Sequence, residues 1–151
     1  MATIHEKLYQ SEDMAQIDFG EYLESLANDI LKTDGVNPRQ VELKVEAPGT
    51  LLGVDSAIPC GLIVNELVSN ALKHAFPGRR QGMIQVGMST NEYHHQLTVR
   101  DNGVGLPDWL DFEHSKTLGL RLVNAWVEQL GGTMELRRDE GVEFTIAFSG
   151  R

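Results

Sequence analysis

The amino-acid sequence predicts an α/β (α+β) two-layer sandwich, in which helices pack on one face of a mixed, mostly antiparallel sheet. Three observations support this class. Segments with apolar residues at helical spacing are each followed by two segments that are expected to be strands. The 151 residues suit one domain, and the hydrophobic fraction of 41% is typical of a folded globular chain. Glycine and proline separate the segments, with no repeat or long linker between them.

The first helix and the two strands after it have clear boundaries. Asp18 followed by Glu21 forms a capping box, and apolar residues then recur at helical spacing as far as Asp34-Gly35. Residues 41–46 alternate between apolar and charged, as in a half-buried strand. A second, short strand is expected over residues 50–54.

A long central helix is expected next, with two further strand pairs and one more helix after it. Asp55 or Ser56 is expected to cap the central helix, with Pro59 in its first turn, and the helix runs to about residue 75. The later elements are a strand at 84–88, a connection at 91–95 that exposes both histidines, a strand at 97–101, a helix at 122–130 and a hairpin of 133–138 with 142–148.

The charge balance limits the kinds of partner. Lys and Arg number 13 against 22 Asp and Glu, a net charge of −9. This argues against nucleic acid and against membrane contact, since both favour a basic surface. The single cysteine, Cys60, excludes an internal disulfide and fits a reducing compartment. No apolar run reaches the roughly 18 residues of a membrane span, so we expect a cytoplasmic domain.

The central helix carries an unusual polar face. At about 100° per residue, Glu66, Asn70, Lys73 and His74 share one arc of the helix, and apolar residues cover the opposite half. Oxygen donors at this spacing suit a hard cation such as magnesium, which takes its remaining ligands from water and phosphate. The alternative is an ordinary solvated helix face.

A second motif follows a strand. Asp101 has the same parity as Leu97 and Val99, so it is expected on the buried face, where a carboxylate needs a hydrogen-bonding partner. The exocyclic amine of a purine is one such partner. Gly103 and Gly105 would let the backbone turn and let a planar ligand approach closely. The alternative is a simple Asp-Asn-Gly turn.

Two weaker motifs complete the series. Thr117, Leu118 and Gly119 lead into a helix whose first amides could bind an anion. The segment Gly141–Phe144 by itself indicates only a hairpin. The histidines lack zinc-site spacing, and no Gly-x-Ser-x-Gly elbow is present.

Taken in order, these motifs resemble those of the GHKL ATP-binding superfamily. Asn65–His74 is similar to its N box, and its three glycine boxes resemble Asp101–Gly105, Leu118–Leu120 and Gly141–Phe144. The resemblance covers about residues 40–150 and implies the Bergerat fold with ATP and Mg²⁺ as ligands. Two positions depart from the pattern: Thr117 stands where the second box usually begins with Gly, and Val142 stands where the third usually has Thr.

Within the superfamily, the run Asn65–Pro77 is most similar to sensor histidine kinases with a short lid. The resemblance implies that Asp101 binds the adenine amine, that Asn70 ligates magnesium and that Glu66 orients the attacking group. The implied catalytic residues are Glu66, Lys73 and His74, and the implied nucleotide-binding residues are Asn70, Asp101, Gly103, Gly105, Thr117, Leu118 and Gly119.

The resemblance also implies a domain organisation. Residues 1–35 are expected to be a lead-in, with the segment from His5 similar to the end of a dimerisation helix, and residues 36–151 the ATP-binding catalytic domain. No histidine lies in an acceptor motif, so we expect a C-terminal piece of a longer receptor. The expected partners are ATP or ADP, a histidine-bearing dimerisation helix, a response regulator indirectly, and a second copy in the full-length protein.

Two other functions remain open at this point. One is an anti-sigma-type serine kinase, which shares the superfamily boxes and binds its protein partner directly. The other is a non-catalytic module whose bound ATP changes its interaction surface. The lead-in favours the histidine kinase over the first, and the complete set of Glu66, Asn70 and Asp101 favours it over the second.

Overall fold

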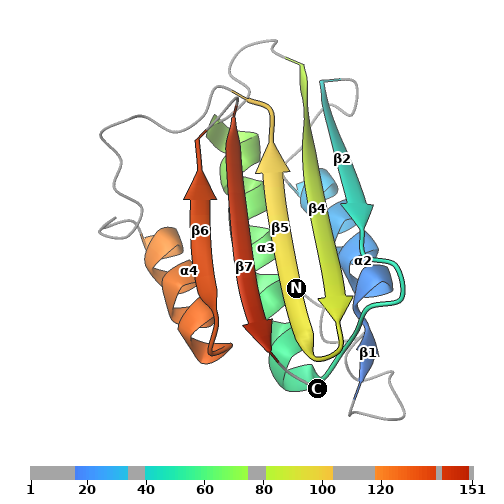
Figure 1. Cartoon of the computed structure of the whole chain (residues 1–151). Coiled ribbons are helices and arrows are strands. Elements are labelled where there is room, and N and C mark those ends of the chain that lie inside the picture. Colours follow the sequence, from blue (N-terminus) through green and yellow to red (C-terminus); the bar gives the residue numbers. More distant parts are fainter. Residues whose placement is uncertain (1–15, 34–39, 75–80, 104–117, 139–140, 150–151) are drawn as a thin grey trace.

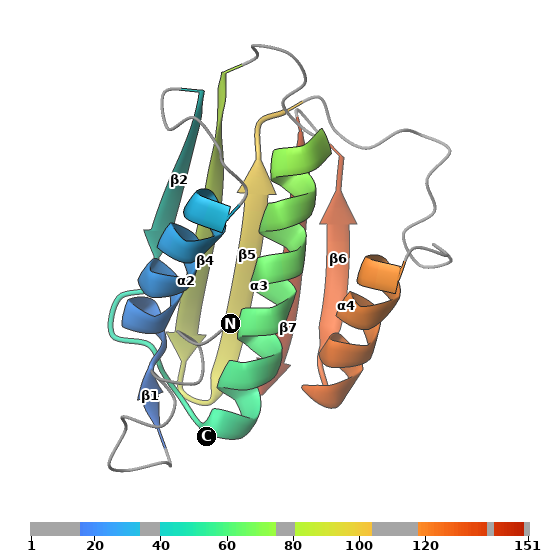
Figure 2. The same cartoon turned by 180° about the vertical axis from the view of Figure 1, so that it is seen from behind.

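The computed structural model describes residues 16–33, 40–74, 81–103, 118–138 and 141–149. These residues form two layers, a five-stranded sheet and a layer of helices on one of its faces. The helices lie behind the sheet in Figure 1 and in front of it in Figure 2, so the other face of the sheet is not covered by them. The predicted fold class is confirmed. None of the described helices is long and apolar enough to cross a bilayer.

The predicted order of helices and strands is also confirmed, with one additional short strand before the first helix. In chain order the described elements are β1 (Ile17–Asp18), α2 (Phe19–Thr33), β2 (Val41–Glu46), β3 (Leu51–Leu52), α3 (Val54–His74), β4 (Gly82–Asn91), β5 (His94–Asp101), α4 (Leu118–Gln129), β6 (Thr133–Arg137) and β7 (Val142–Ser149).

The main sheet is mixed, and its strand order is β2-β4-β5-β7-β6. Strand β2 runs parallel to β4, whereas the other neighbours are antiparallel. Strand β3 does not join this sheet, because it pairs with β1 in a separate two-stranded ribbon. The sequence predicted a short strand over residues 50–54, but a local pattern does not specify a pairing partner.

The two predicted helix caps have different outcomes. The Asp18 Oδ1 atom accepts a hydrogen bond from the Glu21 amide at 3.2 Å, which confirms the first cap. The second was placed too late, because α3 begins at Val54. The Gly53 carbonyl accepts the amides of Ser56 at 3.1 Å and Ala57 at 2.9 Å, so Gly53 is the N-cap. Pro59 consequently lies inside the helix rather than in its first turn.

The core lies between the sheet and the helices. Every second residue of the central strands points inward, as the predicted parity requires, and meets the apolar face of α3. The inward residues include Ile84, Val86 and Met88 of β4, Leu97 and Val99 of β5, Phe144 and Ile146 of β7, and Ile63, Val64, Leu67 and Val68 of α3.

The expectation that both histidines lie in an exposed connection is wrong for His95. The turn between β4 and β5 comprises only two residues, so His95 belongs to β5 and shares the inward parity of Leu97. Its side chain is 5% exposed, and its Nδ1 atom lies 2.9 Å from the Thr90 hydroxyl. Its ring packs 5.1 Å from that of Phe148.

The contact between α2 and α3 contains an unpaired polar atom. Tyr22 of α2 packs against Gly61 of α3, where an added Cβ would collide with the tyrosine ring. The Tyr22 hydroxyl is buried and has no hydrogen-bond partner among the described residues. Burial, with a smaller contribution from the nearby Cys60 thiol, raises the pKa of Tyr22 from 10.0 to about 12.

This contact predicts the effect of Tyr22→Phe on stability. Removing an unsatisfied buried hydroxyl while keeping the ring is expected to raise the free energy of unfolding by about 1 kcal/mol at neutral pH. Between pH 10 and 12 the unfolded wild-type chain releases the Tyr22 proton and the folded chain retains it. Wild-type stability therefore falls with rising pH by up to about 1.4 kcal/mol per unit in this window, and the variant lacks that component.

Urea unfolding at pH 8, 10 and 11 measures both effects. Tyr93→Phe is the matched control, because Tyr93 is 56% exposed in the β4–β5 turn. The burial argument is contradicted if Tyr22→Phe and the wild type lose stability in parallel as the pH rises.

Candidate functional site

Four segments that are distant in the sequence carry the four predicted motifs, and the fold brings them near one another. Figure 2 shows the C-terminal ends of α3 and β5 at the same end of the sandwich, whereas α4 begins partway along it, beside α3. The beginning of β7 lies at the end of β5, since Val142 pairs with Asp101. The predicted motifs are therefore carried by elements that contact one another around α3 and the end of β5.

The polar face of α3 has the predicted orientation. Ile63 and Leu67 are buried, whereas Glu66 and Asn70, one turn apart on the other face, are half-buried. Lys73 is exposed near the end of the helix. His74 is the last residue of α3, and its side chain lies outside the described part of the structure.

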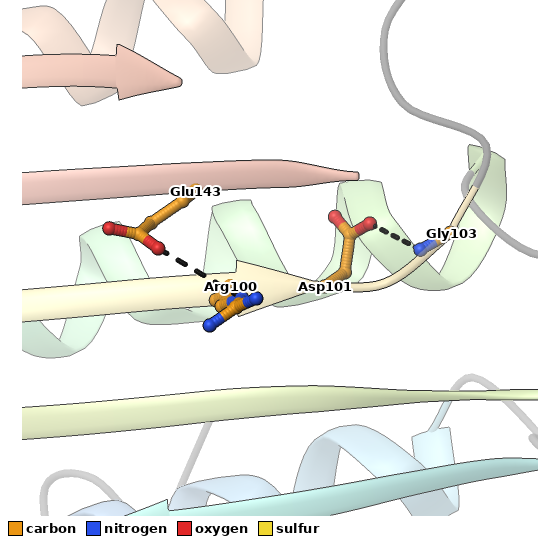
Figure 3. Close-up of polar contacts among 4 residues, drawn as sticks. All are labelled: Arg100, Asp101, Gly103 and Glu143. Atoms are coloured by element: carbon orange, nitrogen blue, oxygen red, sulfur yellow. Dashed lines mark hydrogen bonds and ion pairs between the residues drawn. The ribbon is translucent and has the colours of Figure 1, made fainter. Parts of the chain in front are cut away.

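Asp101 is a buried carboxylate at the end of β5. Its side chain is 7% exposed, which confirms the parity prediction, and its Oδ1 atom accepts a hydrogen bond from the Gly103 amide at 2.9 Å (Figure 3). A carboxylate can accept about four hydrogen bonds, so it can hold the Gly103 amide together with other donors. The adjacent Arg100 is exposed, and its Nε atom lies 3.9 Å from the Oε2 atom of Glu143, its cross-strand neighbour.

Gly141 allows the beginning of β7 to approach the backbone of Asp101 closely. It has a φ of +118°, a conformation that favours glycine, and an added Cβ would collide with the Asp101 carbonyl group and the Asn102 Cα. By itself the segment Gly141–Phe144 predicted only a hairpin. The positive φ and the contact with Asp101 depend on the register between β5 and β7, so the sequence carries no direct signal for them.

Gly119 has a comparable role on the helical side. It lies in the first turn of α4, against α3, and an added Cβ would overlap the carboxylate of Glu66. Helices α3 and α4 therefore touch where the first and third predicted motifs meet. The sequence places both residues in motifs but does not indicate this contact.

Some predicted residues cannot be placed. Gly105 and Thr117 lie outside the described residues, as does the side chain of Leu118. Within the described part of the chain there is no cluster of three or more His, Cys, Asp or Glu side chains that could enclose a metal. The Asn70 carboxamide suits magnesium bound mainly by water and phosphate oxygens, since that ion commonly takes only one or two protein ligands.

A groove elsewhere on the molecule does not coincide with this site. It has a volume of about 950 Å³ and lies between α4 and β6. Its lining includes Asn124, Val127 and Met134, and none of the predicted site residues contributes to it. The groove therefore does not bear on the motifs described above.

The fold and the site define a class of nucleotide-binding domain, and comparison with known families identifies it. Residues 56–150 match the model of the histidine kinase-, DNA gyrase B- and HSP90-like ATPases. The chain belongs to this family. Residues 1–34 match a second model, described as histidine kinase.

Individual relatives agree with this assignment. The chain is 33% identical over 140 residues to blue-light-activated histidine kinase 2 of Erythrobacter litoralis. This match covers 87% of this chain and 40% of the relative. It is 28% identical over 153 residues to the sensor histidine kinase PdtaS of Mycobacterium tuberculosis, covering 97% of this chain and 30% of the relative. The chain thus spans well under half the length of these curated relatives.

A solved structure shows how far the fold is shared. The histidine kinase domain of the Erythrobacter litoralis blue-light activated histidine kinase EL346 superposes with a TM-score of 0.86 at 29% identity. The alignment covers 97% of this chain and 70% of that one. The arrangement of sheet and helices is therefore that of a histidine kinase ATP-binding domain.

The contact between Gly141 and Asp101 yields a prediction. Gly141→Ala is expected to lower the free energy of unfolding by about 1–3 kcal/mol, because the new Cβ meets backbone atoms that cannot rotate away. Gly131→Ala is the control, since Gly131 also has a positive φ, of +66°, but no atom of the described residues lies within 4 Å of its added Cβ. Chemical denaturation of both variants measures the difference, and equal losses would contradict a collision at position 141.

Proposed function

We propose that this chain is the ATP-binding catalytic domain of a sensor histidine kinase. In this function it presents the γ-phosphate of Mg·ATP to a histidine on a dimerisation helix. The observation that carries the proposal is the buried Asp101 carboxylate at the end of β5, which lies at the same end of the sandwich as the C-terminal end of α3, the helix that carries Glu66 and Asn70. Membership of the ATPase family and the match of residues 1–34 to a histidine kinase model support it.

Asp101 is proposed to recognise adenine. An ionised buried carboxylate only accepts hydrogen bonds, so it suits a donor such as the exocyclic amine of adenine, and it would repel a carbonyl oxygen at the same place. The Gly103 amide holds one carboxylate oxygen in place. The backbone at Gly103, Gly105 and Gly119 is proposed to close around the nucleotide, with Thr117 and Leu118 beside it.

The α3 face is proposed to hold the phosphates. Asn70 would ligate magnesium, which when bound neutralises phosphate charge and bridges the phosphate oxygens. Lys73 and His74, one turn further along, are proposed to contact phosphate oxygens. Glu66 would accept a hydrogen bond from the incoming imidazole and so orient it. Phosphoryl transfer requires mainly such positioning and charge neutralisation.

The wider organisation is part of the same proposal. Residues 1–35 would continue from a dimerisation region into the catalytic domain of residues 36–151, and α2 packs on α3 within the described core. The acceptor histidine would come from the dimerisation helix of the whole receptor. A response regulator would then take the phosphate, with the domain in the cytoplasm and two copies paired through that helix.

Nucleotide binding provides the first test. The wild type is expected to bind ADP and a non-hydrolysable ATP analogue, the analogue more tightly with magnesium. Asp101→Asn is expected to weaken binding at least tenfold, because a hydrogen bond to a charged acceptor contributes about 1.5–3 kcal/mol. Calorimetric titration measures both affinities. Asp55→Asn, the same change in the first turn of α3, is the control, and equal weakening by both substitutions would contradict a specific role of Asp101.

Phosphoryl transfer to a supplied dimerisation helix tests the catalytic roles. Glu66→Gln is expected to lower the transfer rate about 100-fold or more while nucleotide affinity is kept. Gly119→Ala is expected to lower it by about tenfold to 100-fold by displacing the Glu66 carboxylate. Its stability should not fall, because alanine favours the helix more than glycine. Glu128→Gln, an exposed change on α4, is the control.

The chemical stability of the product distinguishes the alternatives. Phosphohistidine resists alkali, whereas phosphoserine resists acid, so an acid-stable product on a protein partner would favour the serine kinase. Normal nucleotide binding without transfer to any supplied helix would favour the interaction module. Transfer that is unaffected by Glu66→Gln would remove Glu66 from its proposed role.

A further inference from the structure

The last hydrogen bonds between β4 and β5 are made in an unusual way. The two strands pair as far as Ile84 with Asp101, and the Asn102 amide then donates to the Met83 carbonyl at 3.2 Å. In a regular antiparallel ladder the Met83 amide would return a bond to the Asn102 carbonyl. Instead it donates to the Asn102 side chain, whose Oδ1 atom accepts at 2.8 Å. The side chain of Asn102 thus takes the place of its own backbone carbonyl.

This replacement lets the chain leave the sheet directly after Asp101. Because the Met83 amide is satisfied by a side chain, the peptide after Asn102 does not have to stay in the ladder. The Gly103 amide then turns back to the Asp101 Oδ1 atom at 2.9 Å, forming an Asx turn (Figure 3). The orientation of the Asp101 carboxylate therefore depends on a turn that the Asn102 side chain makes possible.

The opposite side of Asp101 is also restricted. Gly141 packs against the Asp101 carbonyl and the Asn102 Cα so closely that no Cβ fits. Residues 101 and 102 are held by β4 on one side, through Met83, and by β7 on the other, through Gly141. Loss of the bond from the Met83 amide to the Asn102 side chain would leave the backbone bond from the Asn102 amide to the Met83 carbonyl as the last hydrogen bond on the β4 side.

We propose that Asn102 is a positioning residue that sets the selectivity of this site for adenine. It acts by bonding Met83 and does not touch the nucleotide. This inference rests on the proposed function, in which Asp101 accepts a hydrogen bond from the exocyclic amine. Asn102 is exposed just after the end of β5, so its side chain is held in position by its hydrogen bond to the Met83 amide of β4 rather than by burial.

The readout is discrimination between ATP and inosine triphosphate. The inosine base carries a carbonyl oxygen where adenine carries the amine, so a correctly placed carboxylate favours ATP, and a misplaced one favours neither. A change that only destabilises the fold weakens the binding of both nucleotides equally. The ratio of the two dissociation constants therefore reports on the position of Asp101 separately from folding.

The experiment compares Asn102→Ala with the wild type by calorimetric titration of both nucleotides with magnesium. Asn102→Ala is expected to weaken the binding of ATP about tenfold and that of inosine triphosphate less than about twofold. The ratio of the two dissociation constants is therefore expected to change by about fivefold to tenfold. Asn102→Asp keeps an oxygen acceptor for the Met83 amide and should keep the ratio at its wild-type value, even if its added charge weakens the binding of both nucleotides alike. Asn91→Ala, at the other end of β4, is the matched control and should change nothing.

Hydrogen exchange provides a second measurement. Asn102→Ala should increase amide exchange at Met83 and Gly103, whereas Asn91→Ala should not. If the alanine variant does not fold, Asn102→Ser is used, because its shorter side chain remains polar but does not span the same distance.

An unchanged ratio of dissociation constants in the folded alanine or serine variant overturns the inference. Failure of the wild type to bind either nucleotide contradicts the proposed function itself, and an unselective wild type removes the selectivity that Asn102 is proposed to set.

Discussion

The rotation of α3 on the sheet is the constraint on which the rest of the structure depends. Ile63, Val64, Leu67 and Val68 form one apolar face, and burying each such side chain contributes about 1.5–3 kcal/mol. A polar contact contributes about 1 kcal/mol, so hydrophobic burial decides the rotation. Once this face meets the sheet, Glu66 must lie on the other side, against Gly119 of α4. The polar face is thus positioned by the apolar one.

Asp101 imposes the opposite demand, because it places a carboxylate where the same core would otherwise be apolar. Burial of a charged group is costly unless hydrogen bonds compensate. The Gly103 amide supplies one bond from the adjacent turn, and that turn exists because Asn102 satisfies the Met83 amide on β4. Stability and the proposed ligand recognition are therefore coupled at the end of β5. The Tyr22 hydroxyl, which has no hydrogen-bond partner among the described residues, lies in the separate contact between α2 and α3.

Much of the fold and part of the site could be predicted from local patterns. Periods of two and 3.6 residues correctly separated strands from helices, and parity correctly placed Asp101 on the buried face. The prediction failed where a short-range rule had competitors. Gly53 caps α3 although Asp55 and Ser56 are good capping residues, and His95 is buried although paired histidines suggest an exposed turn. In each case the outcome depended on a helix or strand that begins a few residues earlier than expected, and local patterns do not specify boundaries this finely.

The sequence by itself determined the order of the elements, the face on which each apolar residue lies and the four motifs that mark an ATPase of this family. Only the tertiary structure decided which segments touch. The parallel pairing of β2 with β4, the separation of β3 from the main sheet, and the approaches of Gly119 to Glu66 and Gly141 to Asp101 all join distant residues. A repeating pattern specifies the direction in which a side chain points. Its partner depends on strand register and helix packing, which are set by the burial of the whole core.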